Sequence, residues 1–84
     1  MFTQIDYPDA YRRFRDRLRQ ARVHAGLTQE QAAKNLGRPQ SFVSKCESGE
    51  RRLDFVELLI FAKLYGVTDV SLFDPTLAPG EARE

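Results

Sequence analysis

The sequence predicts an all-α fold for a single small domain of 84 residues. Apolar residues recur at spacings of three and four, which is the period of an α-helix, and no stretch alternates between apolar and polar residues as a half-buried strand would. Glycines and capping residues divide the chain into short segments. We therefore expect an irregular N-terminal segment over 1–8, a helical core over 9–73 and a tail over 74–84.

The first helix is predicted over residues 9–25, after the irregular segment that ends at Pro8. Its apolar face contains Tyr11, Phe14, Leu18, Ala21 and Ala25. Most of the arginines between residues 12 and 19 fall on the opposite side. Gly26 stands where a glycine commonly closes a helix.

Two more short helices are predicted over 29–36 and 40–48. Thr28 and Gln31 have the capping-box form, in which an N-cap residue and the residue three positions later bond each other's backbone. Gly37 ends the first of the two helices. Two short helices joined by a turn of this kind form a helix-turn-helix, whose second helix enters the major groove of DNA.

The last predicted elements are a helix over 55–65 and a short turn over 69–73. Asp54 is suited to cap the helix and Gly66 to end it, while Pro75 bounds the turn. The residues after this turn are expected to form a frayed tail.

The charge is distributed unevenly along the chain. Residues 11–52 contain eleven Lys/Arg and four Asp/Glu, whereas 1–10 and 53–84 are both acidic overall. A basic middle between acidic ends favours one surface that binds a polyanion. The alternative is that the arginines simply solvate the outer face of a helix.

Composition argues against several other classes of protein. The single Cys46 excludes an intrachain disulfide, which fits a cytoplasmic setting. We expect no signal peptide and no membrane span, because no apolar run approaches the roughly 18 residues that a bilayer requires. The sequence has no Cys/His cluster and no nucleophile–base pair. We therefore expect neither an enzyme nor a metal or cofactor.

The predicted helix over 40–48 begins with polar side chains that can read base edges. Glutamine suits adenine, and serine and lysine suit other edges. On this basis the candidate base-reading residues are Gln40, Ser41 and Lys45. Phe42 has two possible roles, since its ring could touch a thymine methyl group or pack beside the preceding helix. Cys46 follows Val43 by three residues and should face the core.

Residues 27–67 resemble the Cro and lambda-repressor type of helix-turn-helix domain, often called the XRE family. The matching motifs are LTQ at 27–29, the Ala33–Gly37 spacing, QS at 40–41, the Glu47–Gly49 motif and AKLYGV at 62–67. Arg22 and Gly26 extend the resemblance into the first helix. Pro39 departs from the pattern, which usually has a serine or threonine there.

The resemblance implies a five-helix lambda-repressor-like bundle whose third helix reads double-stranded DNA as a homodimer. It also implies an ion pair between Arg22 and Glu47, which ties the first helix to the third. Gln40, Ser41 and Lys45 match the usual base-reading positions. We expect contacts with the DNA backbone from Gln29, Arg38, Ser44, Arg51 and Arg52.

The helix over 55–65 has more apolar residues than one buried stripe requires. The inward stripe is predicted to contain Phe55, Leu58, Phe61, Ala62 and Tyr65. The remaining residues, Val56, Leu59, Ile60 and Leu64, predict a homodimer interface. Two segments of the same chain could cover them instead, namely Phe2, Ile5 and Tyr7, or Val70, Leu72, Phe73 and Leu77.

The function predicted from these observations is a sequence-specific DNA-binding transcriptional regulator, with repression as the expected activity. An antitoxin that represses its own operon is an alternative, and a neighbouring toxin gene would distinguish it. A protein-interaction module that uses the same fold without DNA is a further alternative. The basic residues next to a polar helix argue against that module.

Overall fold

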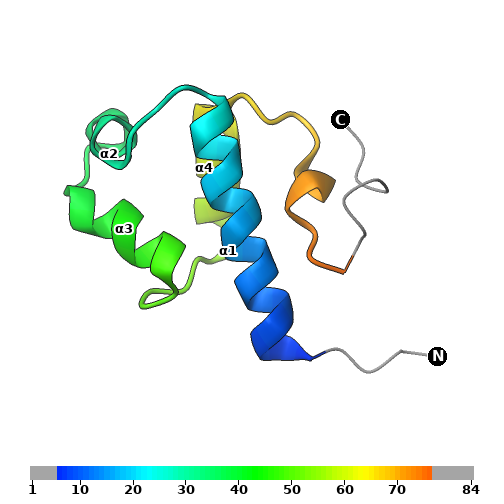
Figure 1. The fold of residues 1–84 in the computed structure, drawn as a ribbon. Helices are drawn as coiled ribbons and strands as arrows, with labels where there is room; N and C mark the ends of the chain where they lie inside the picture. Colours follow the sequence, from blue (N-terminus) through cyan, green and yellow to red (C-terminus); the bar gives the residue numbers. More distant parts are fainter. Residues whose placement is uncertain (1–5, 77–84) are drawn as a thin grey trace.

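The computed structural model describes residues 6–76. This part of the chain consists of helices joined by turns and loops and contains no strand (Figure 1). Its α-helices are α1 (Tyr7–His24), α2 (Gln29–Leu36), α3 (Gln40–Ser48) and α4 (Phe55–Tyr65), followed by the 3₁₀ helix η1 (Val70–Phe73). The all-α prediction is confirmed. The fifth element is a single 3₁₀ turn, so the described region has four α-helices where the bundle was expected to have five.

Helix α1 begins two residues earlier than the sequence predicted. The side chain of Asp6 accepts a hydrogen bond from the backbone N–H of Asp9 at 3.2 Å and so acts as the N-cap. Pro8 therefore lies inside the first turn, where its missing N–H has no partner to lose. The prediction that residues 1–8 are irregular is wrong for Tyr7 and Pro8.

The predicted boundaries of the other three helices are confirmed. Thr28 and Gln31 form the expected capping box, with N–H···O distances of 3.1 and 3.0 Å. Asp54 and Glu57 form a second capping box at the start of α4. These reciprocal bonds satisfy backbone N–H groups that a helix otherwise leaves without a partner.

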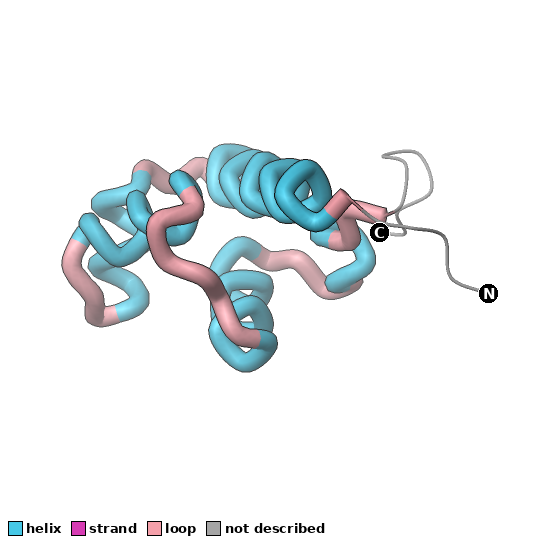
Figure 2. The backbone as a smooth tube through the Cα atoms, turned by 90° about the horizontal axis from the view of Figure 1, so that it is seen from below, coloured by secondary structure: helices cyan, strands magenta, loops and turns pink. Residues whose placement is uncertain are grey.

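Helices α2 and α3 lie to one side of α1, with α4 behind it and η1 on the other side (Figure 1). The loop over 49–54 crosses from α3 to α4 and is visible along its length in the view from below (Figure 2). The buried core consists of Leu18, Ala32, Ala33, Val43, Cys46, Phe61, Ala62, Tyr65 and Phe73. Among the described residues, no helix is both long and apolar enough to cross a membrane.

Helix α4 differs from the prediction at two positions. Phe55 was placed on the inward stripe, but 66% of its surface is exposed. It is the first residue of α4 and lies N-terminal to the part of the helix that packs on the core. Leu64, predicted at the dimer interface, instead packs against the core because it follows the buried Phe61 by three residues.

The outer face of α4 carries a row of exposed apolar side chains. Val56 is 63% exposed, Leu59 41% and Ile60 50%. Element η1 does not cover them, because its Phe73 packs on Phe14 of α1, with ring centroids 6.5 Å apart. Two of the residues considered as possible covers at the N-terminus, Phe2 and Ile5, lie outside the described residues, as does Leu77 at the other end.

Candidate nucleic-acid interface

A buried ion pair joins α1 to α3, as the sequence predicted. Arg22 donates from Nε to Oε2 of Glu47 at 2.7 Å and from Nη2 to Oε1 at 3.2 Å. Their side chains are only 10% and 5% exposed. Gln29 of α2 donates to the same carboxylate at 3.0 Å, and Arg22 also donates to the backbone carbonyl of Leu27 at 2.8 Å. Glu47 therefore holds the ends of three helices together.

This network fixes which face of α3 is exposed. Val43 and Cys46 are fully buried, so the cysteine faces inward as expected. Gln40, Ser41 and Lys45 lie on the solvent side of the helix. The structure thus brings the three candidate base-reading residues together on one exposed face. Burial also raises the pKa of the Cys46 thiol, which keeps it protonated at neutral pH.

The N-terminus of α3 has no side-chain cap. Pro39 occupies the N-cap position with extended backbone geometry, and no side chain accepts a hydrogen bond there. The proline departure from the family pattern therefore leaves the helix geometry intact. It also leaves the first backbone N–H groups of α3 available to an external acceptor such as a phosphate.

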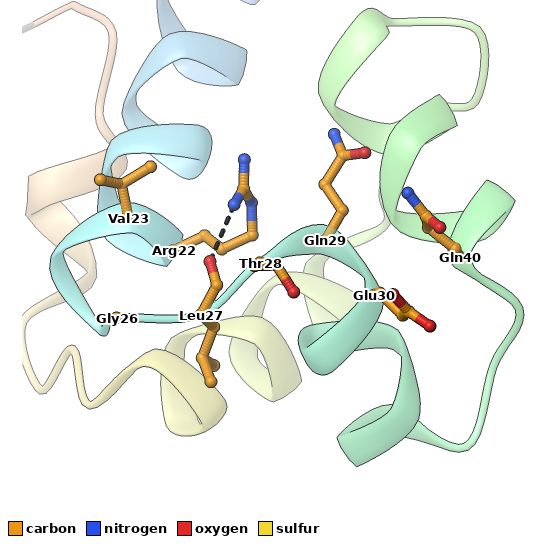
Figure 3. A pocket seen from close by; sticks show the side chains of 8 residues that line it. All are labelled: Arg22, Val23, Gly26, Leu27, Thr28, Gln29, Glu30 and Gln40. Carbon is orange, nitrogen blue, oxygen red and sulfur yellow. Dashed lines mark hydrogen bonds between the residues drawn. The ribbon is translucent and has the colours of Figure 1, made fainter.

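A shallow cavity of about 490 Å³ is bordered by the end of α1, the turn that follows it and the start of α2, with Gln40 contributed by α3. Gln29 and Gln40 line it from two different helices (Figure 3), and the Gln29 amide also donates to Glu47. The side chains of Gln29, at the start of α2, and Gln40, at the start of α3, therefore border the same cavity. A groove of this kind can receive a phosphate at one helix while base edges are read from the other.

Phe42 packs within the protein, which decides between its two predicted roles. Its ring stacks on Phe61 of α4, with the centroids 6.0 Å apart and the planes within 4°. The guanidinium of Arg38 lies over the same ring at 4.3 Å, and that of Arg51 at 4.8 Å. Cation–π contacts with the Phe42 ring thus hold Arg38 and Arg51 beside α3.

Arg51 forms an ion pair within the protein that was not predicted from the sequence. Its guanidinium makes two hydrogen bonds with the carboxylate of Glu57, at 3.0 and 2.7 Å. Hydrogen bonding to Arg51 lowers the pKa of Glu57, so this carboxyl stays ionised well into the acidic range. The same carboxylate belongs to the capping box of α4. Arg51 therefore links the loop after α3 to the start of α4.

Several arginines of the basic middle of the chain have partners within the protein. Arg12 and Arg13 pair with Asp9 on the outside of α1, at 2.5 and 2.9 Å, as expected for arginines that solvate a helix. Arg15 donates to the backbone carbonyl of Glu47 at 3.2 Å. The exposed cations of α3 and of the loop that follows it are Lys45 and Arg52.

Comparison with known proteins agrees with the class that the fold and site define, a helix-turn-helix DNA-binding regulator. A family model described as "Helix-turn-helix domain" matches residues 13–73, and the chain belongs to this family. The structure of an XRE-family like protein from Pseudomonas syringae pv. tomato str. DC3000 is similar, with a TM-score of 0.69 and 45% identity over 82% of this chain and 77% of that one. No curated protein matches the chain.

We predict that Glu47→Ala destabilises the protein strongly. The substitution strands the buried Arg22 guanidinium and should lower the free energy of unfolding by about 3–5 kcal/mol. Urea unfolding of the full chain measures this loss. Glu50→Ala, which removes an exposed carboxylate from the neighbouring loop, is the control and should have little effect. Equal losses in the two variants would contradict a structural role for the ion pair.

Proposed function

We propose that this protein is a sequence-specific transcriptional repressor that acts in the cytoplasm and reads the major groove of double-stranded DNA with α3. The observation that carries the proposal is the exposed polar face of Gln40, Ser41 and Lys45 on a helix whose orientation is fixed by a buried ion pair. A glutamine at the start of such a helix can form two hydrogen bonds with adenine. An ordinary solvated helix has no need of a buried network behind its polar face.

The proposed contacts divide into base reading and backbone binding. Base reading is assigned to Gln40, Ser41 and Lys45. Backbone binding is assigned to Gln29, Arg38, Ser44 and Arg52. Arg51, which the sequence reading placed in the same group, has its guanidinium committed to Glu57 and is assigned a supporting role. A phosphate contact from Arg51 would have to compete with that ion pair.

We predict that Gln40→Ala weakens binding to the preferred site by about 1–3 kcal/mol and relaxes preference at one base pair. The preferred site is first selected from random duplexes with the unaltered protein, and affinities are then measured by fluorescence anisotropy. Gln20→Ala is a matched control, because Gln20 lines a separate hollow between α1, η1 and the end of α4. If Gln40→Ala retained both affinity and preference, α3 would not be the reading helix.

The outer face of α4 supports assembly as a homodimer. Phe55, Val56, Leu59 and Ile60 are all exposed, and a small monomer seldom leaves so many large apolar side chains together. A two-fold axis at this face would make the interface self-complementary. To read paired half-sites, such a dimer must place its two copies of α3 about 34 Å apart, the spacing of successive major grooves on one side of DNA.

We predict that the free protein sediments as a dimer at tens of micromolar. Ile60→Glu places a charge at the centre of the apolar face and should convert the dimer to a monomer. Because Ile60 is half exposed, the substitution should leave the fold intact. Analytical ultracentrifugation measures both species. A monomer in both samples would show that no second copy covers this face.

The apolar face of α4 also supports a second candidate function. An antitoxin that represses its own operon needs a surface for its toxin in addition to one for DNA, and this face lies on a different helix from the polar residues of α3. In that case the face would bind a different protein. The dimer and the antitoxin can be distinguished because only the dimer forms in the purified protein.

A further inference from the structure

Arg52 is the second arginine of the loop after α3, and its guanidinium rests on two tyrosines of α1. The guanidinium carbon lies 5.1 Å from the ring centroid of Tyr7 and 4.9 Å from that of Tyr11. The guanidinium also donates a hydrogen bond to the Tyr7 hydroxyl. The two rings are stacked 6.0 Å apart with 25° between their planes. We call Tyr7 and Tyr11 the aromatic clip.

The aromatic clip is itself anchored at two points. The Tyr11 hydroxyl accepts a hydrogen bond from the backbone N–H of Leu53 at 3.3 Å, which ties the loop to α1. The Tyr11 ring packs on Phe14 at 5.4 Å, and Phe14 packs on the buried Phe73. The spacing of four and three residues along α1 places these rings in one row. Tyr11 is therefore tied to the loop and to the aromatic row that leads into the core, and the more exposed Tyr7 stacks on it at the surface.

The contact leaves most of the guanidinium available. Among the described residues, the only hydrogen bond that the guanidinium donates is the one from Nη1 to the Tyr7 hydroxyl, so its other N–H groups are available to a ligand. The exposed Arg52 makes no ion pair with any described residue, in contrast to Arg51, which is paired with Glu57. Fixing a long side chain in advance removes part of the entropy that binding would otherwise cost. This arrangement therefore suits an arginine that binds an anion at one fixed position.

We propose that Tyr7 and Tyr11 are positioning residues that hold Arg52 for contact with a DNA phosphate. The proposal rests on the proposed DNA-binding function and extends the DNA interface to the first two turns of α1. Both tyrosines lie before residue 13, where the match to the helix-turn-helix family begins. The aromatic clip thus lies outside the part of the chain that the family model matches.

The experiment is a double-mutant cycle on the full chain, with affinity for a mixed-sequence duplex measured at several salt concentrations. Arg52→Ala should make the slope of log affinity against log salt shallower by about 0.9, the value for one phosphate contact. Tyr7→Leu, which removes the ring, should weaken binding about two- to fivefold. The double variant should bind no more weakly than Arg52→Ala alone, because the ring acts through the arginine.

Tyr7→Phe is the matched control, since it keeps the ring and removes only the hydroxyl. It should recover most of the affinity lost in Tyr7→Leu. Because Tyr7 is 55% exposed, neither variant should change the melting temperature by much. Additive effects of Tyr7→Leu and Arg52→Ala, or tighter binding by Tyr7→Leu, would overturn the positioning role. Absence of salt-dependent binding by the unaltered protein would instead overturn the DNA-binding function, and the proposal with it.

Discussion

The ion pair between Arg22 and Glu47 is the interaction on which the position of α3 depends. It is buried, so its attraction is offset by the cost of removing two charges from water. The ion pair fixes the arrangement of the helices, because the Glu47 carboxylate also accepts a hydrogen bond from Gln29 and thereby joins α1, α2 and α3 at one point. An apolar contact of equal area would bury as much surface without fixing the helices in one orientation.

A second set of contacts joins α3 and the loop that follows it to α4. Phe42 stacks on Phe61 of α4, and Arg51 connects the loop after α3 to Glu57 in the first turn of α4. The two sets hold α3 from both sides and leave its polar face to solvent. Arg22 and Arg51 are engaged in these contacts and are therefore not available to DNA. The site consequently has fewer free cations than the basic composition suggested.

Local signals made much of the fold predictable from sequence. Thr28 and Gln31 have the spacing of a reciprocal cap and Asp54 is a suitable N-cap residue, and the helix boundaries predicted from them agree with the structure. The start of α1 was missed because Pro8 was read as a boundary, although a proline is compatible with a first turn. The Arg22–Glu47 pair was expected only through the family resemblance, since nothing local connects residues 25 positions apart.

The roles of the loop arginines could not be read from sequence, because their partners are set by the fold. Arg52 meets Tyr7 across 45 residues, and the orientation of Arg51 toward Glu57 depends on how the loop turns into α4. Phe55 was misplaced for a related reason, since helical periodicity gives the direction of a side chain but not where along the helix the core ends.

The proposed DNA interface consists of the start of α2 and one face of α3, both held in place by this helical framework. The most direct measurement is the change in backbone amide NMR signals of the full chain when a mixed-sequence duplex is added at low salt. We expect the largest changes at Gln29, Gln40, Ser41 and Lys45. Changes confined to the outer face of α4, with these signals unmoved, would contradict it.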